Sequence, residues 1–255
     1  MNIFQAITLS LVEGITEFLP ISSTGHLILA SKLLNIAQTE FVKSFEIAIQ
    51  LGAIFAVVAL YFKTLVRKFE IWKRILIAFI PTAMIGFIFY SLIKRLLLGN
   101  FDVVIFSLFF GGILMLILEK VFETKKGTMS IEDLSPKKSA IVGIIQSVSM
   151  IPGVSRAAAT IYGGLGVGLD RKKAVEFSFL LAVPTMFAAT GMDLIKSGFQ
   201  FGTDDFIILI IGFIGAFISA IVTVKYLINF VKKHSFRSFA IYRIILAVIF
   251  WLVFK

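Results

Sequence analysis

The chain has 255 residues, of which 58% are hydrophobic, with a mean hydropathy of +0.98 and a net charge of +10 at pH 7. This apolar content exceeds what a soluble core can bury, so it excludes an ordinary soluble domain. The absence of cysteine excludes disulfide bonds and thiolate metal sites. The Lys and Arg residues lie between apolar runs rather than on one basic face, which argues against nucleic-acid binding.

The first 30 residues are apolar but are interrupted at Pro20 by the sequence Pro-Ile-Ser-Ser-Thr-Gly-His. Each arm is too short to cross about 30 Å of hydrocarbon as a helix, and proline breaks helices. No Lys or Arg precedes Lys32 and no cleavage site is present, so we expect this segment not to be a signal peptide. The pattern predicts a re-entrant helix hairpin.

Apolar runs of about 20 residues, the length of a membrane-spanning helix, recur along the chain. The six predicted spans lie near 42–62, 75–93, 102–119, 174–195, 206–228 and 238–254. Most of the 25 Lys and Arg residues fall in the loops that this layout assigns to the cytoplasm, 63–74, 119–138, 170–173 and 225–237. The sequence therefore predicts a multi-pass membrane protein.

A second interrupted segment, 139–169, has its break at Pro152-Gly-Val-Ser-Arg156. Its sequence from Gln146 to Arg156 resembles that from Glu13 to Ser23, with one residue fewer before the proline. We therefore predict a second re-entrant hairpin. Non-helical backbone at membrane depth must be buried in protein or reached by water, so both breaks should face an internal cavity.

Each half of the chain, about 1–122 and about 139–255, then has one hairpin and three spans, with a cytoplasmic loop at about 120–138. Because three is an odd number of spans, the second half should be inverted relative to the first. The predicted fold class is an all-α integral membrane protein. It has six transmembrane helices and two re-entrant helix hairpins, arranged as an inverted-topology repeat in a single membrane domain.

Glu13 and Glu17 are four residues apart and share one face of a helix. A charge at the bilayer centre costs roughly 2.5–3.5 kcal/mol on insertion scales, so the pair indicates a site. The alternative is that both carboxylates are solvated at a headgroup interface. If they lie close together they repel, which favours a bridging divalent cation. We expect Mg²⁺, with Ca²⁺ as a second option, held by Glu13 and Glu17.

The second arm of the first hairpin begins with the polar residues Ser22, Ser23, Thr24, Gly25 and His26. A helix start presents free N–H groups and the positive end of the helix dipole, and Arg156 adds a planar fork for phosphate oxygens. An anionic phosphorylated ligand fits this set best. Taken singly, Ser22 and Thr24 are typical helix caps. Arg156 is also compatible with a structural ion pair, and the two roles can coexist.

The motifs Glu13-Gly-Ile-Thr-Glu-Phe-Leu-Pro-Ile-Ser-Ser-Thr-Gly-His26 and Pro152-Gly-Val-Ser-Arg156 closely resemble those of the bacterial undecaprenyl-diphosphatases, also called bacitracin-resistance proteins. The stretches 45–52 and 176–184 are also similar, so the resemblance covers essentially the whole chain. One departure is Ala157, where the family typically has a serine after the arginine. Because Ser155, Arg156 and Thr160 remain, we expect activity to be retained.

The resemblance implies a hydrolase of the bacterial cytoplasmic membrane that cleaves undecaprenyl diphosphate to undecaprenyl phosphate and inorganic phosphate. This reaction recycles the lipid carrier for peptidoglycan and other cell-wall polymers and gives bacitracin resistance. We expect the site to open to the extracytoplasmic side and to take its lipid substrate from the membrane. The oligomeric state stays open, with a homodimer as one option.

The expected catalytic residues are Ser23 as nucleophile, Glu17 or His26 as its base, and Arg156 as the group that stabilises the transferred phosphoryl. His26 as nucleophile, through a phosphohistidine, is the open alternative. The expected substrate-binding residues are Glu13, Ser22, Thr24, Gly25, Ser155 and Thr160.

A lipid-phosphate carrier is the alternative function, because inverted repeats with broken helices are also typical of secondary transporters. A carrier needs an anion site and alternating access but no nucleophile with a neighbouring base. The cluster of Glu17, Ser23 and His26 exceeds what anion binding demands, and the enzyme is therefore favoured.

Overall fold

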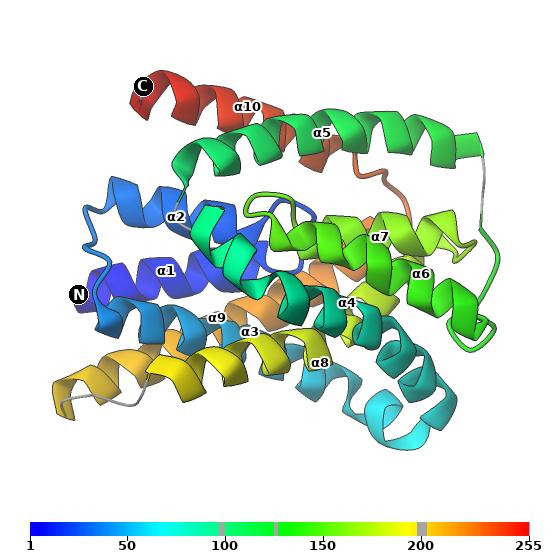
Figure 1. Cartoon of the computed structure of the whole chain (residues 1–255), viewed down its shortest axis with the longest axis horizontal. Helices are drawn as coiled ribbons and strands as arrows, with labels where there is room; N and C mark the ends of the chain where they lie inside the picture. The colour runs from blue at the N-terminus through cyan, green and yellow to red at the C-terminus, as the bar shows by residue number, and fades with distance from the viewer. Residues whose placement is uncertain (97–99, 125–126, 198–202, 255) are drawn as a thin grey trace.

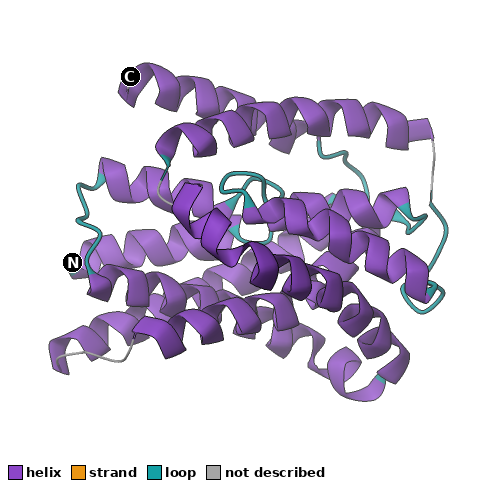
Figure 2. Ribbon diagram, in the orientation of Figure 1, coloured by secondary structure: helices purple, strands orange, loops and turns teal. Residues whose placement is uncertain are grey.

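The computed structural model describes residues 1–96, 100–124, 127–197 and 203–254, and this part of the chain is helical without a β-strand (Figure 2). In the first half of the chain the helices are α1 (Ile3–Thr16), α2 (Ser23–Leu33), α3 (Glu40–Arg67), α4 (Phe69–Leu96) and α5 (Phe101–Thr124). In the second half they are α6 (Pro136–Gln146), α7 (Arg156–Gly166), α8 (Arg171–Ser197), α9 (Thr203–Phe230) and α10 (Arg237–Phe254). A short 3-10 turn, Ser147–Met150, follows α6.

Six of the described helices, α3, α4, α5, α8, α9 and α10, are long and apolar enough to cross a membrane. They coincide with the six predicted spans, and the prediction of a multi-pass membrane protein is confirmed. Some helices run past the predicted ends: α3 continues to Arg67 and α4 starts at Phe69, so the predicted loop at 63–74 is reduced to Lys68. Lys and Arg are good helix formers, and their long stems let the charge reach the surface while the backbone stays helical.

Segments far apart in the sequence pack side by side (Figure 1). Helix α3 packs against α8 and α9, α1 against α9, α4 against α6, and α5 against α10. The largest core cluster includes Phe18, Phe177, Phe179 and Phe236, which are fully buried. Each half of the chain thus completes its packing only against the other half.

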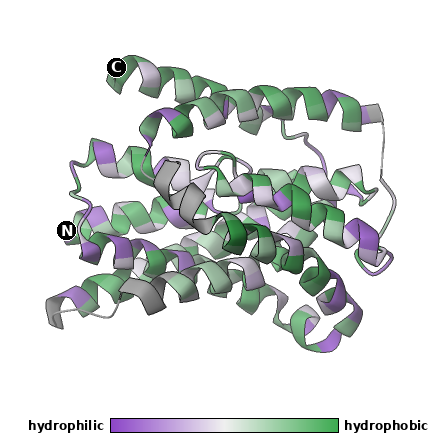
Figure 3. Cartoon of the chain, in the orientation of Figure 1, coloured by the Kyte–Doolittle hydropathy of each residue, from purple (hydrophilic) through white to green (hydrophobic). Residues whose placement is uncertain are grey.

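The long helices consist largely of hydrophobic residues (Figure 3). Large side chains such as Phe62, Phe87, Phe110, Ile218 and Leu252 are each at least 57% exposed. Exposed apolar surface on this scale is unfavourable in water and is expected where hydrocarbon is the solvent.

Glycines allow the closest crossings between the two halves. A Cβ added to Gly14 of α1 would lie 2.5 Å from the Ala216 carbonyl oxygen of α9. A Cβ added to Gly143 of α6 would lie 1.8 Å from the Ala78 carbonyl oxygen of α4. Both short helices therefore lie directly on the backbone of a spanning helix.

Gly143→Ala should lower the melting temperature of the purified protein in detergent, because overpacking in a close contact costs about 1–3 kcal/mol. The matched control is Gly191→Ala in α8, where nothing lies within 4 Å of the added Cβ. This control should be neutral or slightly stabilising, since alanine favours helix more than glycine does. Equal melting temperatures for the two variants would contradict the close α4–α6 crossing.

Candidate active site

The first break separates α1 from α2. Helix α1 ends at Thr16, and turns lead through Pro20 to Ser22, which has a φ of 73°. The Ser22 Oγ accepts a hydrogen bond from the Gly25 amide at 3.4 Å, so Ser22 is the N-cap of α2. Positive φ is uncommon for a residue with a side chain and is a feature of constrained sites.

The second break separates α6 from α7 in the same way. After the 3-10 turn, Gly153 has a φ of 93° and Ser155 a φ of 78°. The Ser155 Oγ accepts a hydrogen bond from the Ala158 amide at 3.1 Å and caps α7. The two helices that follow the breaks, α2 and α7, thus begin with a strained serine cap followed directly by Ser23 and by Arg156.

The two breaks meet at a cavity of about 180 Å³. The first break contributes Glu17, Ser22, Ser23 and Thr24, and the second contributes Ser149, Pro152, Gly153, Ser155 and Arg156. Gln50 of α3 and two α8 residues, Met186 and Ala189, complete the lining. Both breaks were expected to face a cavity, and residues of both line this one.

Glu17 connects the two breaks chemically. Its Oε2 accepts a hydrogen bond from the Ser23 hydroxyl, and its Oε1 lies 2.8 Å from Arg156 Nη2. The Glu17 and Arg156 side chains are only 9% and 12% exposed, so little solvent screens the pair. The carboxylate is placed to accept the serine proton, and the guanidinium beside it can donate to phosphate oxygens.

Arg156 is itself held in place from α7 and α8. Its Nη1 donates to the Ser178 carbonyl at 2.9 Å. The Thr160 Oγ1 lies 2.6 Å from the Ser178 Oγ and 2.9 Å from the Arg156 carbonyl oxygen. Thr160 is fully buried and is not one of the residues that line the cavity. Its hydroxyl therefore supports Arg156 rather than reaching a ligand directly.

Glu13 lies one helical turn before Glu17 and is fully buried. Neither of its carboxyl oxygens has a hydrogen-bond partner among the described residues. No group of three or more His, Asp or Glu side chains is close enough to hold a metal in the described ranges. Glu13 does not line the cavity, whereas Glu17 does. Mg²⁺ usually takes one or two protein carboxylates together with water and substrate phosphates, so the two carboxyls have the donor chemistry that such an ion needs.

Both ring nitrogens of His26 have partners other than Ser23. Its Nδ1 lies 2.7 Å from the Ser22 carbonyl oxygen, and its Nε2 lies 2.8 Å from the Tyr242 hydroxyl of α10. A carbonyl can only accept, so Nδ1 carries the proton, and Nε2 accepts from Tyr242 in the neutral ring. His26 does not line the cavity. The geometry therefore favours Glu17 over His26 as the base for Ser23.

The remaining predicted residues fall into two groups. Thr24 lines the cavity, whereas Gly25 contributes its amide to the cap at Ser22. Ala157, which stands where relatives were expected to carry serine, is buried in the apolar core and does not line the cavity. Its missing hydroxyl therefore leaves the cavity lining intact.

Sequence reasoning missed four residues that contact or support the site. Gln50 lies in the family-like stretch 45–52, which was the one available signal for it. Ser178 lies in the family-like stretch 176–184 and Arg243 is a charge inside a predicted span, whereas Tyr242 carries no such signal. All three contact the breaks only after helices from both ends of the chain have packed together.

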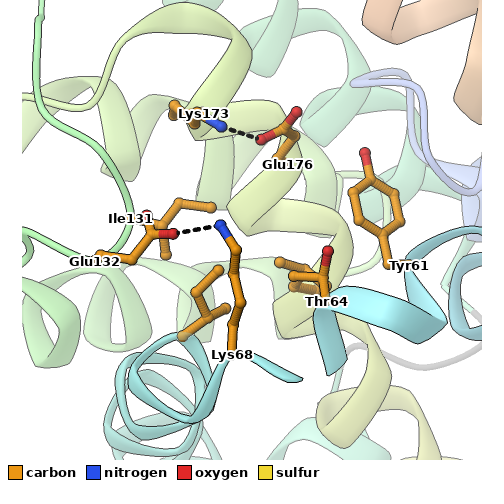
Figure 4. A pocket seen from close by; sticks show the side chains of 9 residues that line it. Tyr61, Thr64, Lys68, Ile131, Glu132, Lys173 and Glu176 are labelled. Atoms are coloured by element: carbon orange, nitrogen blue, oxygen red, sulfur yellow. Dashed lines mark hydrogen bonds and ion pairs between the residues drawn. The ribbon is translucent and has the colours of Figure 1, made fainter. Parts of the chain in front are cut away.

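A second cavity, of about 170 Å³, lies where α3 ends and α8 begins (Figure 4). Lys68 pairs there with Glu132 and Lys173 with Glu176, each at 2.8 Å. The Lys68 ammonium donates to Glu132 and lowers the pKa of that carboxyl. The lining of this second cavity includes Tyr61 and Thr64 but neither serine nor histidine. The cavity between the breaks is therefore the better candidate for catalysis.

Ser155→Ala should lower the free energy of unfolding by about 1 kcal/mol through loss of the N-cap. Ser155→Gly loses the same cap but relieves the positive φ, so its unfolding free energy should stay within about 0.5 kcal/mol of the parent protein. The measurement is the denaturant midpoint in mixed micelles. A glycine variant less stable than the alanine variant would contradict the strained geometry.

The comparison with known proteins identifies the family. The model of the family described as "Bacitracin resistance protein BacA" matches residues 6–249. The chain is 54% identical over 250 residues to the undecaprenyl-diphosphatase of Aquifex aeolicus (strain VF5), covering 98% of each chain. It is 52% identical over 253 residues to that of Sulfurihydrogenibium sp. (strain YO3AOP1), covering 99% of each. The chain therefore belongs to the bacitracin-resistance protein family.

Proposed function

We propose that this protein hydrolyses undecaprenyl diphosphate to undecaprenyl phosphate and inorganic phosphate. The observation that carries the proposal is the connected set Ser23, Glu17 and Arg156 in the cavity where α2 and α7 begin. The proposal agrees with the name of the similar proteins, undecaprenyl-diphosphatase. The similarity to them extends over nearly their whole length. In a cell this reaction returns the lipid carrier to cell-wall polymer synthesis.

In the first step, the Ser23 Oγ attacks the terminal phosphorus while Glu17 accepts the hydroxyl proton. The Oγ–P bond forms, and the bond from that phosphorus to the bridging oxygen breaks, so undecaprenyl phosphate leaves with the bond's electron pair. Glu17 passes this proton to the departing undecaprenyl phosphate and is again a base. In the second step, water attacks the phosphoserine and Glu17 accepts a proton from it. The bond between phosphorus and the Ser23 Oγ breaks with its electron pair on Oγ, which takes the proton back from Glu17. Inorganic phosphate is released and Ser23 is regenerated.

Arg156 and the two helix starts stabilise the transferred phosphoryl group. Phosphoryl transfer depends mainly on positioning and on charge stabilisation. When substrate binds, Arg156 exchanges part of its contact with Glu17 for phosphate oxygens, which frees the carboxylate to act as a base. The first turns of α2 and α7 direct their N–H groups and the positive ends of their dipoles at the same anion.

Glu13 and Glu17 are the residues that would hold a divalent cation, Mg²⁺ or Ca²⁺. The support is the buried Glu13 carboxyl without a partner, one turn from Glu17. When bound, the ion would neutralise charge on the diphosphate. Glu13 contributes to this site a carboxyl group that is free of competing hydrogen bonds.

The chain is proposed to be an inverted-topology repeat with two re-entrant hairpins, α1–α2 and α6–α7. In support, both halves run in the order of two short helices followed by three long ones. Helices α2 and α7 are each 11 residues long and follow a serine with positive φ. In each half, the first short helix packs on the second long helix of the other half: α1 packs on α9, and α6 packs on α4.

The catalytic cavity is proposed to open to the extracytoplasmic side of the bacterial cytoplasmic membrane. Gln50 of α3 lines this cavity and Lys68 at the end of α3 lines the other. At 1.5 Å per residue, these positions are about 27 Å apart along the helix. Lys68 and Lys173 mark the basic end, which the positive-inside rule assigns to the cytoplasm.

A lipid-phosphate carrier is not favoured. Phe179 lies edge-on to Phe18, at 5.4 Å between ring centroids, and to Tyr61, at 6.5 Å. Phe18 adjoins Glu17 of the catalytic cavity and Tyr61 lines the other cavity, so these three packed rings connect residues next to the two cavities and would have to move apart to open a path between them. A carrier also has no use for the hydrogen bond between Ser23 and a carboxylate.

Ser23→Ala, Glu17→Gln and Arg156→Lys should each lower phosphate release from undecaprenyl diphosphate by about 10²–10⁴-fold. The variants remove the nucleophile, the base and the bidentate fork, respectively. The control is Lys68→Ala in the other cavity, which should keep the parent rate. A Ser23→Ala variant with the parent rate would eliminate Ser23 as nucleophile, and a well-folded parent protein without phosphate release would refute the diphosphatase.

Without metal, Glu13→Gln should keep a melting temperature close to that of the parent protein, because it replaces one buried polar group without a partner by another of the same size. Mg²⁺ should stabilise the parent protein, by about 2.7 kcal/mol at 100 times its dissociation constant, but should stabilise Glu13→Gln much less. The measurement is thermal unfolding with EDTA and then with increasing MgCl₂. An equal Mg²⁺ shift in both proteins would exclude Glu13 as a ligand.

A further inference from the structure

Arg243 is a buried cation outside the catalytic cavity. Its side chain in α10 is 0% exposed, although burying a charge away from water is costly. Helix α5 makes room for it, because a Cβ on Gly111 would lie 2.2 Å from Arg243 Nη2. Arg243 does not line the cavity that holds Ser23. Its burial therefore needs a reason other than contact with the substrate.

The hydrogen bonds of Arg243 go to backbone carbonyls of both breaks. Nη2 donates to the Gly153 carbonyl at 2.9 Å, and Nη1 donates to the Val154 carbonyl at 3.1 Å and to the Pro20 carbonyl at 3.4 Å. Nη2 also donates to the Ser107 carbonyl of α5 at 3.0 Å. One rigid guanidinium thus joins the first break, the second break and α5.

The carbonyls of the two breaks lie within three residues before the reactive side chains. Pro20 comes three residues before Ser23, and Gly153 and Val154 come just before Ser155 and Arg156. Hydrogen bonds from a charged donor are shorter and stronger than neutral ones, and the fork of arginine fixes their directions. The position of one guanidinium therefore determines where α2 and α7 begin relative to each other.

We propose that Arg243 is a positioning residue that sets the distance and orientation between Ser23 and Arg156. This inference rests on the diphosphatase proposed above. Arg243 touches neither substrate nor reacting atoms, and it acts through the backbone of the two breaks. A displacement of about 1 Å between catalytic groups can lower a rate about 100-fold.

Arg243→Lys keeps the positive charge but loses the fork that bridges the breaks. Its kcat for phosphate release should fall about 100-fold, while KM stays within about threefold, because the lipid tail and the charges that attract the diphosphate are unchanged. Gly111→Ala is a second way to remove the guanidinium from its position between the breaks. It leaves Arg243 in the chain but pushes its guanidinium out of place, so its kcat should fall in the same direction.

A double-mutant cycle with Arg156→Lys separates positioning from simple destabilisation. If Arg243 works by placing Arg156 opposite Ser23, then Arg243→Lys should cost less than about threefold once Arg156 is already replaced. If it merely lowers the folded fraction, the same 100-fold factor should appear in both backgrounds. That result would overturn the proposal, as would an unchanged kcat in both Arg243→Lys and Gly111→Ala.

The matched control is Arg171→Lys, which alters another arginine that is paired in the bundle, 2.8 Å from the fully buried Glu119. Its effect on the rate should be the same with and without Arg156→Lys. All variants are compared as monodisperse protein in detergent with melting temperatures recorded. Absence of phosphate release from the parent protein refutes the proposed function. If the parent protein is active and Arg243→Lys lowers the rate by the same factor with and without Arg156→Lys, only the role of Arg243 is refuted.

Discussion

Non-helical backbone inside an apolar helix bundle must find its hydrogen bonds within the protein, because hydrocarbon offers none. Two breaks impose this constraint here, one before Ser23 and one before Arg156. Serine side chains cap the helix starts, and the Arg243 guanidinium donates hydrogen bonds to carbonyl oxygens of both breaks. The surrounding long helices supply the apolar shell in which these polar contacts are protected from competing water.

The same constraint creates the reactive site. Ending a helix inside the bundle and starting another leaves first-turn N–H groups that can bind an anion. Because both breaks reach one cavity, two such helix starts converge where Ser23 and Arg156 also lie. Glu17 connects them, since its two oxygens contact the serine hydroxyl and the guanidinium at the same time. Binding and proton transfer thus share one small set of atoms.

Helices from the two halves of the chain pack against each other around this arrangement. Gly14 and Gly143 let the short helices α1 and α6 approach the backbone of α9 and α4, which belong to the opposite half. Helix α10 then closes the structure over α5, bringing Tyr242 against His26 and Arg243 against the breaks. Residues at the end of the chain therefore control the geometry of residues near its beginning.

The sequence by itself determined the six spans, both breaks and the core of the candidate site, Glu17, Ser23 and Arg156. These features are local: hydropathy over about 20 residues, a proline with polar neighbours, and charges in apolar segments each leave a mark in the sequence. Only the tertiary structure decided that Glu17 contacts both Ser23 and Arg156, that His26 is held by Tyr242, and that Thr160 lies behind Arg156. Such contacts join residues up to 216 positions apart, and their geometry depends on how helices from both halves pack, which no local pattern encodes.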